Sequence, residues 1–361
     1  MIKKHFFKFL AFLCYLLVLL ELLSRLVYWV PQLSARLWAD EDNSWRRTWV
    51  KRHQQTNIPV YHSFDKYDPS KGWATRPNIR NMTVFDNKTL NTGPDGFRMT
   101  RELSAKKTAK GRILVLGDSF TFGDEVSDRE TYPYYLQQML PDFDIINAGV
   151  HGYGHDQMLI LLKEVAPKLK PDFVVIGYMP WDAKRNVLLF RDFAKPRFVI
   201  GKDGLILTGT PVPRPEDVLR RDWARPCLLD IYAIAVNKIK VSTGSYDEEV
   251  GTITTAILSE MIRTIEAMDA IPIFVYLPSP ERFRDPAPIT PAEAYLFSLC
   301  ETGRNARCIS TRPYFAAKIA NGTIFREEGH YDPAGNLTVA EAIRDYLVND
   351  SRLQPVRRKP H

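Results

Sequence analysis

The sequence predicts a three-layer α/β fold, in which helices cover both faces of a parallel β-sheet. Four short, nearly continuous apolar runs follow residue 111, as strands that are buried on both faces require. Segments with helical apolar spacing alternate with these runs, and this alternation is typical of a doubly wound domain, whose sites form at the carboxyl ends of the strands. The predicted strands are RILVLG (112–117), FDIINAG (143–149), DFVVIGYM (172–179) and IPIFVYLP (271–278).

The predicted helices lie between and after these strands. The pattern places them at 132–140, 155–166, about 252–268 and 333–347. One segment, about 187–251, interrupts the alternation: KPRFVIGKDGLILTGTPVPRP predicts a β-hairpin that turns at Lys-Asp-Gly, and a Pro- and charge-rich stretch follows. Such an insertion either decorates the rim of a site or is a solvent-exposed embellishment. The domain as a whole is expected over 111–350.

The chain has 361 residues, of which 45% are apolar, enough for one large domain with appendages or for two modest domains. Its formal charge of +7 is concentrated partly at the two ends. We interpret this charge as a membrane-surface or solubility feature, and we expect no nucleic-acid partner. The terminal basic residues are Lys3, Lys4 and Lys8, and, in the tail 351–361, Arg352, Arg357, Arg358 and Lys359.

Residues 1–32 predict a membrane anchor. The apolar stretch 6–30 would extend roughly 37 Å as a helix, which crosses a bilayer core with some tilt. Glu21 and Arg25 are four residues apart and could pair on that helix. A cleaved signal peptide is the alternative, but its small-x-small cleavage chemistry is poor here, with QLSA the nearest candidate. An uncleaved anchor would place the body of the chain outside the cytoplasm.

Residues 33–110 are polar and rich in turn formers, with short β-prone pieces such as MTVF. We interpret this part as a membrane-proximal segment followed by a small β-rich lead-in to the main domain. Of the four cysteines, Cys300 and Cys308 bracket a short polar turn, and they either close a disulfide or are two free thiols. Because no two cysteines have C-x-x-C spacing, a zinc or thioredoxin-type site is not expected.

Ser119 follows the first predicted parallel strand, in the stretch LVLGDSFTFGDE. A side chain at this point would project into the crevice at the carboxyl end of the sheet, where Ser119 could act as a nucleophile. Gly117, Asp118 and Ser119 also favour an ordinary strand-to-helix turn. The two interpretations are separated by whether a base is available to the serine.

Three of the seven histidines lie in the predicted domain, and His330 is the best candidate base. It occurs in FREEGHYDPAGN, just before the last helix, with Glu327 and Glu328 three and two residues upstream. An acid near an imidazole fixes its tautomer and stabilises the imidazolium, and either glutamate could serve. His151 and His155 are assigned no role.

Gly149 lies in NAGVHGYG, after the second strand. Its backbone N–H could stabilise an oxyanion together with the N–H of Ser119. Simple turn geometry is the alternative explanation for this glycine.

At these three places the chain resembles the SGNH hydrolases, also called the GDSL lipase and esterase family. The matches are GDSFTFG, Gly149 and EEGHYDPAG, in the family's order, and the resemblance covers about 112–348. It implies a flavodoxin-like SGNH fold, Ser119 as nucleophile, His330 as general base, and the N–H groups of Ser119 and Gly149 as oxyanion donors, with no cofactor or metal. The lead-in DPSKGWATRPN…GFRMTRE also looks like the segment that precedes the domain in membrane-anchored bacterial members, whose anchor lies in the inner membrane.

Two departures from the family pattern stand out. The family has an Asn-Asp pair after the third strand, and its asparagine is a further oxyanion donor. In GYMPWDAKRN, Asp182 fits the aspartate and Trp181 takes the place of the asparagine; Asn186 is an alternative donor. The second departure is glutamate in place of the usual aspartate next to the histidine.

These features predict a membrane-anchored ester hydrolase that acts on an O-acyl group, plausibly an O-acetyl group, of an extracytoplasmic glycan. An O-acyltransferase with the same residues is one alternative, because it differs only in passing the acyl group to a sugar hydroxyl. A catalytically degenerate glycan-binding or assembly protein is the other. Trp181 favours the latter, because an aromatic ring in a crevice can stack on a sugar.

Overall fold

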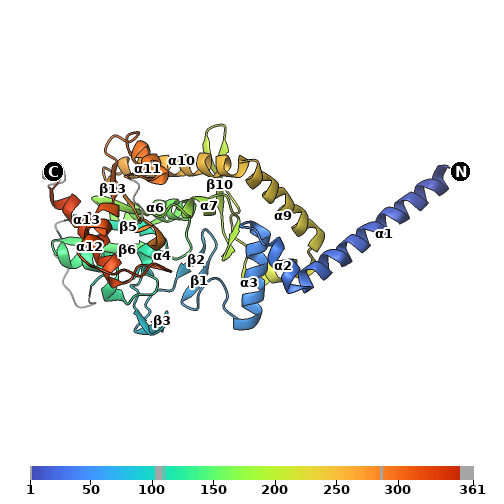
Figure 1. Ribbon diagram of the computed structural model, residues 1–361, viewed down its shortest axis with the longest axis horizontal. Helices are drawn as coiled ribbons and strands as arrows, with labels where there is room; N and C mark the ends of the chain where they lie inside the picture. The colour runs from blue at the N-terminus through green and yellow to red at the C-terminus, as the bar shows by residue number, and fades with distance from the viewer. Residues whose placement is uncertain (1, 102–108, 110, 285–287, 350–361) are drawn as a thin grey trace.

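The computed structural model describes residues 2–101, 109, 111–284 and 288–349 (Figure 1). Its centre is a five-stranded sheet with the order β13-β12-β7-β5-β6, in which all neighbours are parallel. The four predicted strands are confirmed, and the short edge strand β13 was not predicted. The strands are β5 (Gly111–Gly117), β6 (Phe143–Gly149), β7 (Phe173–Tyr178), β12 (Ile271–Tyr276) and β13 (Arg307–Ser310).

Helices cover both faces of this sheet, which confirms the three-layer α/β/α fold. Alternate residues of each strand point to opposite faces. Leu114 and Leu116 of β5 belong to the apolar cluster that includes α6 (His155–Leu169), α10 (Ser245–Glu266) and α11 (Pro291–Cys300). Ile113 and Val115 belong to the opposite cluster, which includes α5 (Tyr132–Met139), α12 (Arg312–Ala320) and α13 (Pro333–Asn349). All four predicted helices are present.

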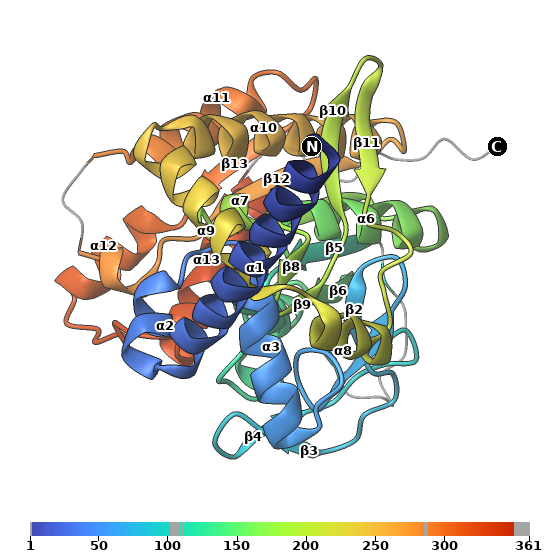
Figure 2. The same ribbon diagram turned by 90° about the vertical axis from the view of Figure 1, so that its right-hand side faces the viewer.

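The insertion after β7 contains the predicted hairpin, formed by β10 (Arg197–Gly201) and β11 (Gly204–Thr208), which projects from the body in Figure 2. The rest of the insertion is more helical than predicted. Its Pro-rich stretch leads into two helices, and α10 begins seven residues before its predicted start, so that Gly251 lies within a helix. The remaining elements here are α7 (Asp182–Arg185), β8 (Phe190–Arg191), β9 (Phe193–Ala194), α8 (Pro215–Ala224) and α9 (Cys227–Ser242).

The lead-in contains two small antiparallel hairpins and, before them, two helices that were not predicted. The lead-in packs on the edge of the main sheet: Arg98 forms a bridge with Asn147 of β6, and the indole of Trp73 donates to the carbonyl of His151 over 3.0 Å. The elements are α2 (Pro31–Leu37), α3 (Asp42–Thr56), β1 (Asp65–Asp68), β2 (Gly72–Thr75), β3 (Met82–Val84) and β4 (Lys88–Leu90).

A single long helix, α1 (Ile2–Trp29), projects away from the body (Figure 1). Its segment His5–Trp29 is long and apolar enough to cross a membrane. Near its end, the predicted pair of Glu21 and Arg25 forms over 2.7 Å, and Glu21 also accepts the N–H groups of Cys227 and Leu228 at the start of α9, each over 3.0 Å. Glu21 therefore fastens α1 to the body.

In the last third of the chain, the structure contains the Cys300–Cys308 disulfide, which joins α11 to β13. The predicted basic tail 351–361 lies outside the described residues.

Candidate active site

Ser119 is the first residue of a four-residue helix, α4 (Ser119–Phe122), directly after β5. The carboxylate of Asp118 caps this helix by accepting the N–H of Phe120 over 3.0 Å. Gly117 lets the helix fold back tightly, because a Cβ at this position would lie 1.9 Å from Oγ1 of Thr121. The Gly-Asp-Ser sequence thus ends the strand, caps the helix and places Ser119 at the carboxyl edge of the sheet.

The His330 imidazole joins Ser119 to a carboxylate. Its Nε2 lies 2.8 Å from Oγ of Ser119, and its Nδ1 lies 2.9 Å from Oε1 of Glu125. With the Nδ1 proton donated to Glu125, Nε2 is free to accept the proton of the serine hydroxyl. The ring of Phe120 packs against the imidazole, with 4.9 Å between their centroids. The predicted serine and histidine are therefore brought together.

The acid that faces His330 is Glu125, which corrects the expectation of Glu327 or Glu328. Glu327 points instead to Arg284, whose Nε donates to it over 2.7 Å, and Glu328 is exposed. Glu125 reaches the histidine because α4 ends at Gly123 with a positive φ of 90°, and Glu125 itself has a φ of 65°. This tight turn directs its carboxylate back over the helix.

The carboxylate of Glu125 is held in its ionised form. Burial alone would raise its pKa, but the hydrogen bond from His330 and the charges of His330 and Arg326 outweigh burial and lower the pKa below its ordinary value. Arg326 also donates a hydrogen bond to the second oxygen of Glu125. An ionised carboxylate at this point stabilises the imidazolium that forms when His330 takes a proton.

Gly149 does not present a free N–H, in contrast to the expectation. Its N–H donates to Oδ1 of Asn147 over 3.0 Å. Glycine is required here for packing, because a Cβ would lie 2.4 Å from the backbone nitrogen of Phe122 in α4. Ser119 keeps its role as a candidate donor: as the first residue of α4, its N–H has no intrahelical acceptor.

Asn186 also does not reach the site as a free donor. Its amide nitrogen contacts Oγ1 of Thr254 at 2.9 Å and Nδ1 of His155 at 3.2 Å, and its carbonyl oxygen accepts the N–H of Asp156 over 3.2 Å. The side chain is fully buried and is engaged in the packing of α6 against α10. Trp181 differs: it begins the turn into α7, and 48% of its side chain is exposed.

Next to Ser119 in the chain, the buried carboxylate of Asp118 shares one cation with that of Asp182. Nη1 of Arg185 lies 2.6 Å from Oδ1 of Asp182 and 3.5 Å from Oδ2 of Asp118. Burial, together with the neighbouring Asp118 carboxylate, raises the pKa of Asp182 well above its ordinary value, although Arg185 opposes the shift.

No protein-family model matches this sequence, and no curated protein matches it. The chain is similar to solved structures of hydrolases at low identity. One is LAE5, an alpha/beta hydrolase enzyme from the metagenome of Lake Arreo, with a TM-score of 0.42, 14% identity, and 69% of this chain and 98% of that chain covered. Another is the psychrotrophic esterase EstA from Pseudoalteromonas sp., with a TM-score of 0.39, 14% identity, and coverage of 66% and 100%.

A third similar structure is a catalytic mutant of Axe2, an acetylxylan esterase from Geobacillus stearothermophilus, with a TM-score of 0.40, 14% identity, and coverage of 66% and 94%.

Proposed function

We propose that this chain is an SGNH-type serine ester hydrolase, with Ser119 as nucleophile, His330 as general base and Glu125 as the acid that orients it. The observation that carries the proposal is the continuous array from Oγ of Ser119 through both nitrogens of His330 to the carboxylate of Glu125, over 2.8 and 2.9 Å. A nucleophile, a base and an orienting acid within hydrogen-bond reach are the arrangement that acyl transfer requires.

In this mechanism Oγ of Ser119 attacks the ester carbonyl carbon while Nε2 of His330 takes the hydroxyl proton. The tetrahedral intermediate carries its negative charge on the former carbonyl oxygen, toward which the N–H of Ser119 is available. The intermediate collapses as His330 returns the proton to the leaving alcohol. Water then attacks the acyl-serine, again with His330 as base, and releases the acid and the free serine.

The substrate that we propose is an O-acyl ester of a glycan, with an O-acetyl ester as the representative case. Trp181 supports this proposal because it follows the end of β7 by three residues, just as Ser119 follows the end of the neighbouring strand β5, and its indole is half exposed. An exposed aromatic ring can stack on the face of a sugar.

We further propose that α1 is retained as a single membrane anchor and that the domain lies outside the cytoplasm, in the periplasm of a bacterium. Retention is supported by Glu21, which caps α9 and would be lost with a cleaved leader. Ser24 is also buried, and the guanidinium of Arg47 lies 3.4 Å above the ring of Tyr28. The Cys300–Cys308 disulfide favours an oxidising compartment.

Labelling with a fluorophosphonate probe tests the proposed nucleophile. The full-length protein in detergent is treated with the probe, and mass spectrometry of its peptides locates the adduct. We expect one adduct on Ser119, no adduct in Ser119→Ala, and much slower labelling in His330→Ala. A protein that is folded by circular dichroism and forms no adduct would instead be a glycan-binding member without turnover.

An O-acyltransferase would use the same three residues and differ only in its acceptor. The two activities are separated by incubation with p-nitrophenyl acetate in the presence and absence of an oligosaccharide. Free acetate in both cases identifies a hydrolase, whereas an acetylated sugar identifies a transferase.

A further inference from the structure

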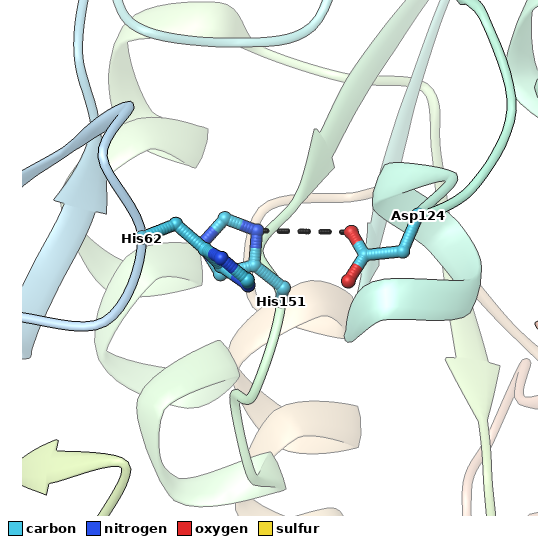
Figure 3. Close-up of side chains that lie close together, drawn as sticks. All are labelled: His62, Asp124 and His151. Atoms are coloured by element: carbon cyan, nitrogen blue, oxygen red, sulfur yellow. Dashed lines mark ion pairs between the residues drawn. The ribbon is translucent and has the colours of Figure 1, made fainter. Parts of the chain in front are cut away.

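Two histidines and an aspartate meet beside the candidate active site, and we call them the His62–Asp124–His151 cluster (Figure 3). His62 belongs to the lead-in, Asp124 follows α4, and His151 follows β6. One potential ligand atom from each side chain lies within 4.8 Å of the other two, and Nδ1 of His151 is 3.8 Å from Oδ1 of Asp124. Three segments that are distant in sequence thus direct side chains to one point.

The atoms that converge there lack partners. Nε2 of His62, Nδ1 of His151 and Oδ1 of Asp124 are all buried and make no hydrogen bond within the described part of the chain. His151 is fully buried, and only 5% of Asp124 is exposed. A buried polar atom without a partner destabilises the folded state, so three such atoms together indicate a shared partner.

A neighbouring carboxylate, Asp65, orients the ring of His151 so that its free nitrogen faces the cluster. Both carboxylate oxygens of Asp65 lie 2.8–2.9 Å from Nε2 of His151, so that this nitrogen carries the proton and the lone pair remains on Nδ1. A carboxylate behind a histidine in this way orients the ring and raises its basicity as a ligand.

An aromatic shell encloses the cluster. The rings of Phe64 and Phe122 stack 5.9 Å apart, and each lies 5.0 Å from the ring of His151 in an edge-to-face arrangement. Tyr61 contacts both histidines. Such a shell excludes bulk water and strengthens the attraction between a carboxylate and a cation.

We propose that the His62–Asp124–His151 cluster binds one divalent transition-metal cation of the kind that imidazole ligands prefer, with Zn²⁺ as the representative ion. Two imidazole nitrogens and one carboxylate oxygen suit Zn²⁺ and its neighbours in the first transition row, whereas Mg²⁺ and Ca²⁺ take oxygen ligands. Three protein ligands leave a fourth tetrahedral position for water. This site could not be predicted from the sequence, because its ligands share no short motif.

The metal would join the lead-in to the catalytic domain at the point where Asp124 meets the active site. Oδ1 of Asp124 faces the cluster, while its Oδ2 lies 4.0 Å from Nε2 of His330. A cation bound to the Asp124 carboxylate would offset its negative charge and weaken its attraction for Nε2 of His330. This nitrogen would then interact with Oγ of Ser119 alone. The metal is thus assigned a positioning role, outside the bond-making steps.

Zinc binding by the full-length protein in detergent tests the proposal. The protein is stripped with dipicolinate, and zinc affinity is measured by competition with a chromophoric chelator; Co²⁺ is added separately for its visible absorption. We expect one zinc per chain, at least tenfold weaker binding in His62→Gln and in Asp124→Asn, and a 10- to 100-fold loss in Asp65→Asn. The Co²⁺ absorption should disappear in the two ligand variants.

His53→Gln is the matched control, because His53 belongs to the same lead-in but its Nδ1 is engaged by the carbonyl of Ile58. It should bind zinc as the wild type does. Circular dichroism confirms that each variant is folded, and His62→Gln keeps the test valid if Asp124→Asn does not fold. Equal zinc affinity in the wild type and His62→Gln, or no zinc bound by the wild type, would overturn the proposal and leave a bridging water as the occupant.

Discussion

At the scale of single residues, the imidazole of His330 is held between two partners that are far away in sequence. Glu125 and Ser119 are 205 and 211 residues upstream of it, yet both belong to α4 and the turn that follows it. One short element therefore sets both distances, whereas Glu327, which precedes His330 in the chain, pairs with Arg284 instead. Arg326, four residues before the histidine, forms an ion pair with the carboxylate of Glu125.

The replacement of Trp181 by asparagine tests what the tryptophan does. An asparagine at the start of α7 would supply an amide donor where the SGNH pattern has one, and a missing oxyanion donor costs about a hundred- to thousandfold in rate. We expect Trp181→Asn to raise kcat/KM for p-nitrophenyl acetate. Trp181→Phe, which keeps a ring but removes the indole N–H, should not raise it. An unchanged or lower rate in Trp181→Asn would mean that the tryptophan does not stand in for a missing donor.

At the scale of elements, α4 depends on two glycines that let it lie against the sheet. Gly117 gives room to Thr121, and Gly149 of β6 gives room to the backbone of Phe122. Arg98 from the lead-in holds the other end, since its buried guanidinium donates to Asp128 over 2.8 Å and to the carbonyl of Phe122 over 3.0 Å. The sheet, its edge strand and the lead-in together fix the position of Ser119.

A pair of glycine substitutions tests this packing. Gly149→Ala should destabilise the protein by about 1–3 kcal/mol, because its Cβ would lie 2.4 Å from the backbone of α4, which cannot move freely. Gly251→Ala should have the opposite effect and stabilise it by up to about 1 kcal/mol, since Gly251 is exposed within α10 and nothing lies near its Cβ. Thermal unfolding followed by circular dichroism measures both. Equal effects of the two substitutions would refute the packing role of Gly149.

The elements that sequence predicted best are those with a strong periodic signal. Buried strands such as β5 and β7 are nearly uniform in apolar character, whereas β13 is a four-residue edge strand that begins with arginine. For the site, the serine and the histidine could be found because each follows a local pattern. Glu125 could not be selected in the same way, because its role depends on a positive φ and on a contact across 205 residues, although Asp124 and Glu125 stand in the same quoted stretch.

At the scale of the whole molecule, the anchor, the lead-in and the domain form a connected chain of contacts. Glu21 of α1 caps α9, and α9 in turn meets α3, because the buried carboxylate of Asp230 pairs with Arg46 and Arg47 over 2.5 and 2.8 Å. Asp42 at the start of α3 accepts the N–H groups of Leu189 and Phe190 over 2.7 and 3.0 Å. The membrane-proximal helices are thereby tied to the insertion that follows the third strand of the domain.

This connection predicts that α1 stays on the protein. The protein isolated from bacterial membranes should have the intact mass of the full chain, with or without its first methionine. A mature form that begins after the QLSA segment, at about residue 36, would show instead that the helix is a cleaved leader. Mass spectrometry of the undigested protein distinguishes the two forms.

Glu125, and not a glutamate next to His330, is the proposed acid of the candidate triad. The most direct measurement compares kcat/KM for p-nitrophenyl acetate in Glu125→Gln and Glu327→Gln, with folding checked by circular dichroism. Loss of the orienting carboxylate should lower kcat/KM by about 10²- to 10⁴-fold in Glu125→Gln. Glu327→Gln should stay within about twofold of the wild type, because exposed surface pairs such as Glu327 with Arg284 contribute little. The reverse order of the two effects would contradict the account.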